Sequence, residues 1–197
     1  MARHTKKTTQ QLTLGALLTA LVVVLQFAGS FIHFGAFSIS LVLIPIVIGA
    51  ATCGPYIGAW LGLAFGAVVL FSGDATFFLQ FNAPATIILV LVKGTAAGLF
   101  AGLVYLLMKR FGEHAAVVSA AIVCPLVNTG LFLGGCFLFF QEAVAVLAEG
   151  AGFTGSLTAY MFVGLAGGNF LFELIVNLLL SPLILRLLHI RRKQGAI

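Results

Sequence analysis

Charged residues are scarce in this sequence. Only 8% of its 197 residues are Asp, Glu, Lys or Arg, whereas 61% are hydrophobic and the mean hydropathy is +1.19. A soluble domain of this length cannot bury so much apolar surface, so most of the chain is expected to lie in lipid. The length favours a single domain over residues 1–197.

The motifs of several enzyme classes are missing as well. The sequence has no Gly-x-x-x-x-Gly-Lys-Ser/Thr loop for ATP, no His-Glu-x-x-His motif and no Gly-x-Ser-x-Gly motif. The three cysteines, Cys53, Cys124 and Cys136, fall in or beside apolar runs and lack the spacing of a zinc site. We therefore expect a chain that is not an enzyme and has no cofactor and no metal site.

Six apolar segments are separated by polar or glycine-rich connections. They predict helices at about residues 12–29, 38–53, 56–72, 85–108, 115–140 and 157–188. Pro45 is expected to kink the second helix. Glycines recur at four-residue intervals in the third and fourth helices: Gly58, Gly62, Gly66, Gly94, Gly98 and Gly102. Such rows of small residues favour close contact between membrane helices.

Positive charge gathers on one side of the expected membrane. Nine of the ten Lys and Arg residues lie at that side: Arg3, Lys6, Lys7, Lys109, Arg110, Arg186, Arg191, Arg192 and Lys193. Because basic segments remain in the cytoplasm, both termini are predicted to be cytoplasmic, including the basic stretches 1–10 and 189–197. The alternative, a cleaved signal peptide, is disfavoured because its apolar core is usually only about 7–15 residues long.

Several polar side chains interrupt the apolar helices. Asn169, Glu173 and Asn177 follow one another at intervals of four and therefore share one helical face. Lys93 and Asn128 are expected in the outer half or the midplane of the membrane. A carboxylate at that depth costs about 2.5–3.5 kcal/mol, so such groups normally face the bundle interior and have a partner. The pattern predicts either a pocket open to the outside or a Lys93–Glu173 ion pair that only joins two helices.

The expected outer connections are rich in aromatic residues. They contain Phe31, Phe34, Phe37, Phe71, Phe77, Phe78, Phe81 and Phe153, with Tyr160 nearby. One interpretation is a belt of aromatic side chains at the membrane interface. The other is an aromatic lid over a small, partly planar ligand, with polar groups beneath it.

Two motifs, together with six short spans and a basic amino terminus, point to a known family. Ala16-x-x-x-Ala20 in the first helix resembles a helix-contact motif of the substrate-binding S-components of energy-coupling factor (ECF) vitamin transporters. The stretch from Leu43 to Gly58 is similar to the junction of the second and third helices in that family. The resemblance implies an all-α integral membrane protein, a compact bundle of six transmembrane helices, in a bacterial cell membrane.

The resemblance also implies a mechanism. An S-component captures a water-soluble vitamin from outside with high affinity, and its first helix docks on a membrane scaffold subunit driven by two cytoplasmic ATPases. Ala16 and Ala20 would then form the docking surface. The substrate-binding residues implied by their regions are Phe34, Asp74, Gln80, Asn82, Lys93, Asn128, Asn169 and Glu173.

The ligand and two other functions stay open. The junction of the second and third helices resembles that of riboflavin-binding members of the family, and Lys93 could meet a carboxylate, as pantothenate or a folate would require; riboflavin and pantothenate rank first. A stand-alone ion-coupled transporter that uses Lys93 and Glu173 as a proton relay is the first alternative, although no inverted repeat is visible. A membrane scaffold protein without a ligand is the second alternative.

Overall fold

The computed structural model describes residues 2–30, 33–34, 37–38 and 41–194, with side chains for residues 9–30 and 41–189. The long apolar runs form the main helices: α1 (Ala2–Gly29), α2 (Leu43–Cys53), α3 (Pro55–Ser72), α5 (Ala83–Met108), α6 (Glu113–Phe139) and α9 (Gly168–Gln194). Shorter elements lie between them: β1 (His33–Phe34), β2 (Phe37–Ser38), α4 (Thr76–Phe81), α7 (Gln141–Gly150) and α8 (Leu157–Tyr160). A 3₁₀ turn, η1 (Lys109–Phe111), follows α5, and a π-helical segment, η2 (Met161–Gly167), joins α8 to α9.

The helices agree with the apolar pattern of the sequence. Within the described residues, five helical stretches are long and apolar enough to cross a membrane: Thr9–Gly29, Pro55–Ser72, Ala83–Phe111, Glu113–Phe139 and Leu157–His189. The one predicted helix outside this set is the second along the chain. It corresponds to α2, which is apolar but has only 11 residues. At 1.5 Å per residue it is about 16 Å long, roughly half of a hydrocarbon core of about 30 Å.

The predictions about the second helix are wrong at its start. We expected a helix from residue 38 with a kink at Pro45, but α2 begins at Leu43 and Phe37–Ser38 form strand β2. Pro45 therefore lies in the first helical turn, where a backbone N–H has no partner within the helix. The helix ends as predicted, because Gly54 has a φ of 101° and Pro55 begins α3.

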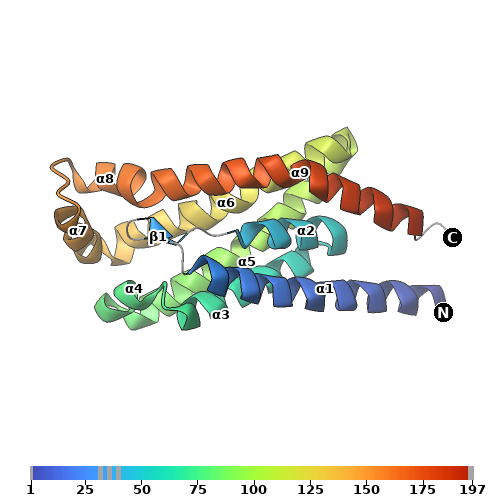
Figure 1. Ribbon diagram of the computed structural model, residues 1–197, viewed down its shortest axis with the longest axis horizontal. Coiled ribbons are helices and arrows are strands. Elements are labelled where there is room, and N and C mark those ends of the chain that lie inside the picture. The colour runs from blue at the N-terminus through green and yellow to red at the C-terminus, as the bar shows by residue number, and fades with distance from the viewer. Residues whose placement is uncertain (1, 31–32, 35–36, 39–40, 195–197) are drawn as a thin grey trace.

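The connections at one end of the bundle are more ordered than we expected. Residues 72–84 contain helix α4, and residues 141–157 contain helix α7. In Figure 1, α4 and α7 lie at the end of the bundle opposite the amino end of α1 and the carboxyl end of α9. A separate apolar cluster, which includes Phe78, Phe140, Val144 and Tyr160, packs these short helices against the longer ones.

The two glycine rows meet face to face between α3 and α5. A Cβ atom added to Gly62 would collide with the carbonyl oxygen of Gly94, and one added to Gly98 would collide with the carbonyl oxygen of Gly58. The backbones of α3 and α5 are therefore in direct contact, as the glycine spacing predicted. This contact positions Phe65 of α3 and Lys93 of α5 beside the same cavity.

Candidate ligand-binding site

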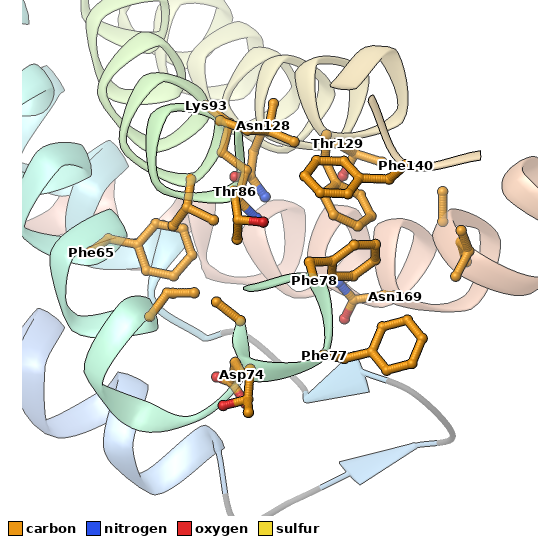
Figure 2. Close-up of a pocket in the computed structure, with 18 of the residues that line it drawn as sticks. Phe65, Asp74, Phe77, Phe78, Thr86, Lys93, Asn128, Thr129, Phe140 and Asn169 are labelled. Atoms are coloured by element: carbon orange, nitrogen blue, oxygen red, sulfur yellow. The ribbon is translucent and has the colours of Figure 1, made fainter. Parts of the chain in front are cut away.

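A cavity of about 370 Å³ lies inside the bundle near α4. Its wall combines residues from α1, α3, α4, α5, α6, η2 and α9, so segments from most of the chain contribute to it. Figure 2 shows Lys93, Asn128 and Thr86 at one end of this cavity and Asp74 at the other. The volume falls in the range of about 300–1,000 Å³ that is typical of small-molecule sites.

The ammonium group of Lys93 lies among aromatic rings. Its Nζ atom is 5.0 Å from the ring centroid of Phe132 and 5.9 Å from that of Phe65. These are cation–π distances, and each contact contributes about 0.5–2 kcal/mol. In the part of the chain with described side chains, no ion pair joins Lys93 to Glu173. The interpretation of these two groups as a simple structural staple is therefore not supported.

Glu173 is buried with only one carboxylate oxygen satisfied. Its side chain is 2% exposed, and the Asn169 amide donates a hydrogen bond of 3.1 Å to Oε1. The second oxygen, Oε2, has no hydrogen-bond partner. Asn177 lies one turn deeper and donates a 2.9 Å bond to the backbone carbonyl of Glu173. A buried acceptor without a donor is costly, which marks Glu173 Oε2 as a site that a ligand can satisfy.

Asn128 presents a second unsatisfied acceptor. It is 5% exposed, lines the cavity from α6, and its Oδ1 atom has no hydrogen-bond partner. The preceding turn contains Pro125, which is buried within α6. A proline inside a helix removes one backbone hydrogen bond and bends the helix. In Figure 2, Asn128 lies near Lys93 at the same end of the cavity.

A second polar group surrounds Asp74 at the other end of the cavity. Helix α3 ends at Ser72 and is capped by Gly73, whose φ of 94° is a left-handed conformation that suits glycine. The following Asp74 Oδ2 accepts hydrogen bonds from Gln26 Nε2 of α1 and from Ser72 Oγ, the latter at 3.2 Å. Asp74 is therefore held in place by the protein itself, unlike Glu173 Oε2.

Aromatic rings form the wall between the two polar ends. Phe78 of α4 packs edge to face on Phe132 at 5.6 Å and on Phe140 at 5.3 Å between ring centroids. Phe77 also lines the cavity and contacts Phe78 at 5.5 Å. The outer phenylalanines differ in exposure, because Phe71 is 83% exposed whereas Phe78 is 8% exposed and lines the cavity.

Five of the eight predicted substrate-binding residues line the cavity: Asp74, Lys93, Asn128, Asn169 and Glu173. Two others do not line it. Gln80 is exposed on α4, and Asn82 is exposed and caps α5 by accepting a 3.1 Å hydrogen bond from the Ala85 backbone. The side chain of Phe34 lies outside the described residues, so this prediction is untested.

Sequence analysis missed several residues that line the cavity. Gln26 is 3% exposed. A polar amide near the end of the first apolar segment is the sequence signal that would have identified it as a candidate cavity residue. Thr86 and Thr129 gave no such signal. Phe65, Phe132 and Phe140 had none either, because phenylalanine is equally common on the lipid face of a membrane helix.

The predicted docking residues lie on the surface of α1. Ala16 and Ala20 are both exposed, whereas Gly15 and Leu18 of the same helix are buried against the bundle. The neighbouring Thr19 accepts a 3.2 Å hydrogen bond from Trp60 Nε1 of α3, which ties α1 to the bundle beside this face. The alanines are thus available for contact with another helix rather than used in internal packing.

Comparison with known proteins supplies the family. A family model described as the ECF transporter substrate-specific component matches residues 10–185, nearly the whole chain. The chain belongs to this family. An S-component is a membrane-embedded subunit that binds a small-molecule substrate and works with ECF scaffold and ATPase subunits, and its family is not a catalytic one. No curated protein and no solved structure matches this S-component.

Proposed function

We propose that this S-component captures a water-soluble vitamin or a related micronutrient with high affinity from outside the cell. The observation that supports the proposal most directly is the cavity with two unsatisfied acceptors, Glu173 Oε2 and Asn128 Oδ1, on its wall. Buried polar groups in a stable protein normally have partners, so these two favour a site completed by a ligand. Asp74, Lys93 and Asn169 complete the proposed set of binding residues.

The proposed topology places the cavity toward the exterior. We propose that α2 is the sixth transmembrane helix of a single domain, residues 1–197, and that both termini are cytoplasmic in a bacterial plasma membrane. The basic residues near both termini and at η1 support this orientation. The cavity is near α4, at the end of the bundle opposite the amino end of α1 and the carboxyl end of α9, and would receive its ligand from outside.

Docking on the scaffold subunit is assigned to the exposed face of α1. The small side chains of Ala16 and Ala20 allow another helix to approach closely. ATP hydrolysis would take place in two partner ATPases. Riboflavin and pantothenate are the candidate ligands.

The direct test is to identify what the protein carries. The full chain is purified in lipid nanodiscs after growth in rich medium, and the small molecules released on denaturation are identified by mass spectrometry. We expect one water-soluble micronutrient in a stoichiometric amount. An empty protein that binds no member of a vitamin panel would contradict the proposal. Uptake driven by a proton gradient in liposomes that contain this chain alone would instead support an ion-coupled transporter.

A further inference from the structure

The interior end of the cavity has more acceptors than the protein can satisfy. Glu173 Oε2 and Asn128 Oδ1 both lack donors, although the ammonium group of Lys93 lines the same cavity. The Lys93 ammonium instead lies 5.0 Å from the ring centroid of Phe132 and forms no ion pair with Glu173. Among the described residues, Glu173 Oε2 and Asn128 Oδ1 can therefore accept hydrogen bonds from a molecule bound at this end, and Lys93 Nζ can donate one.

This pattern specifies the edge of the molecule that fits. The ligand must present donors to Glu173 Oε2 and Asn128 Oδ1 and an acceptor to Lys93 Nζ. A ring N–H adjacent to a carbonyl group, as in a lactam or an imide, offers a donor and an acceptor side by side on one edge. A carboxylate offers acceptors only and leaves both protein acceptors without donors.

The charges on the cavity wall also disfavour an anionic ligand. Among the described residues, the wall carries two carboxyl groups, Asp74 and Glu173, and a single ammonium group, Lys93. A ligand carboxylate placed on Lys93 would lie in the same small cavity as both carboxyl groups. Like charges that are brought together in an interface are strongly unfavourable, and they serve to exclude wrong partners.

The wall between the polar groups suits a flat aromatic body. Phe65, Phe77, Phe78, Phe132 and Phe140 all line the cavity. Phe78 contacts Phe132 and Phe140 in edge-to-face geometry, so the wall is a fixed aromatic surface rather than a set of independent side chains.

Granted the capture function proposed above, we infer that the ligand is an uncharged, planar heterocycle with a lactam or imide edge. Its ring N–H donates to Glu173 Oε2, and the adjacent carbonyl oxygen accepts from Lys93 Nζ. Asn128 Oδ1 accepts from a second N–H or O–H group of the ligand. The ring of the ligand lies against Phe78, Phe132 and Phe140, and the ligand itself places no carboxylate at this end of the cavity.

The test uses two matched pairs of probes with the full chain in nanodiscs. Riboflavin has an imide N–H, and 3-methylriboflavin has a methyl group in its place. Pantothenate has a carboxylate, and pantothenol has a hydroxymethyl group there. Affinities are measured by isothermal titration for the wild type and for Glu173→Leu, which removes the acceptor. Glu173→Gln, which retains an acceptor, is the second variant and keeps the test possible if the leucine variant does not fold.

We expect riboflavin to bind and the N-methyl group to lower its affinity strongly. Sites built to hydrogen-bond a group reject analogues that lack it by up to about 10⁴–10⁵-fold. In Glu173→Leu the same methyl group should lower the affinity by less than about tenfold, because the acceptor for the N–H group is gone. Glu173→Gln keeps an acceptor and should retain part of the preference for riboflavin over 3-methylriboflavin. Pantothenate and pantothenol should both bind far more weakly than riboflavin.

Two results of the titrations would overturn the inference and leave the capture function intact. One is tighter binding of pantothenate than of riboflavin, with the affinity lost in pantothenol. The other is an N-methyl effect of the same size in the wild type and in both Glu173 variants. If no probe binds, the compound released from the purified protein decides: an anionic compound, or one without a lactam or imide edge, refutes the inference alone. Protein that releases nothing and binds nothing refutes the capture function as well.

Discussion

The replacement of Lys93 by methionine separates a binding role from a structural one. Lys93→Met keeps the length of the side chain and removes its charge. The free protein loses two cation–π contacts, at 5.0 and 5.9 Å, each worth about 0.5–2 kcal/mol. It also no longer holds a partly buried ammonium group without an ion-pair partner, whose desolvation costs up to several kcal/mol. We therefore expect the free energy of unfolding to stay the same or to increase.

The affinity for the ligand should change in the opposite direction. A hydrogen bond to a charged group contributes about 1.5–3 kcal/mol. At 1.4 kcal/mol for each factor of ten, Lys93→Met should weaken binding by about 10- to 150-fold. The measurement is isothermal titration of the ligand that is recovered from the purified protein.

Stability can be followed with a thiol-reactive fluorescent dye. Cys124 and Cys136 are both 0% exposed, so they react only when the bundle opens. Cys53 is partly exposed and contributes a constant background. Val92→Met is the matched control, because Val92 is the preceding residue of α5 and is 49% exposed. It should change neither the affinity nor the unfolding temperature.

A clear loss of stability in Lys93→Met with unchanged affinity would refute this reasoning. It would mean that Lys93 supports the fold through contacts within the protein. The site would then have to be assigned without Lys93.

Three further predictions concern other parts of the chain. Ala16→Trp should leave ligand binding unchanged and abolish uptake in cells that contain the partner subunits, because the residue is exposed on α1. Gly62→Val should destabilise the bundle by at least about 1–3 kcal/mol in the thiol assay, since α5 backbone occupies the space. Asn82→Ala should cost about 0.5–2 kcal/mol of stability through the lost helix cap, with unchanged affinity for the ligand.

Each of these changes has a matched control. Leu103→Trp places the same bulk on an exposed position of α5 and should not affect uptake. Gly134→Val adds the same side chain where nothing lies within 4 Å, so its effect should be small. Asn82→Asp retains a capping oxygen and should retain stability. Loss of ligand binding in Ala16→Trp would contradict the first prediction. The second would be wrong if Gly62→Val were as stable as Gly134→Val, and the third if Asn82→Ala bound the ligand more weakly than the wild type.

Gln80 and Asn82 are the two predicted binding residues that have described side chains and do not line the cavity. Both belong to the connection in which ligand contacts were expected, and both are polar. The chain folds there into α4 and the first turn of α5, so Gln80 faces outward and Asn82 satisfies a backbone N–H. Phe78, two residues before Gln80, faces the cavity instead. Side chains two residues apart on a helix point in different directions, and in α4 it is Phe78 that packs into the apolar cluster with Phe140 and Tyr160.

The sequence by itself determined the class of the protein and the approximate course of its long helices. Composition, apolar length and four-residue spacing are local properties of the sequence. They predict helices directly, because an apolar segment in a bilayer must satisfy its backbone hydrogen bonds within itself. The sequence did not determine which faces of those helices pack against one another. In lipid both faces of a helix are apolar, so hydrophobic periodicity does not identify the inner one. Only the packed structure, through the α3–α5 glycine contact and the aromatic cluster on Phe78, decided that Lys93 and Glu173 line one cavity without forming an ion pair.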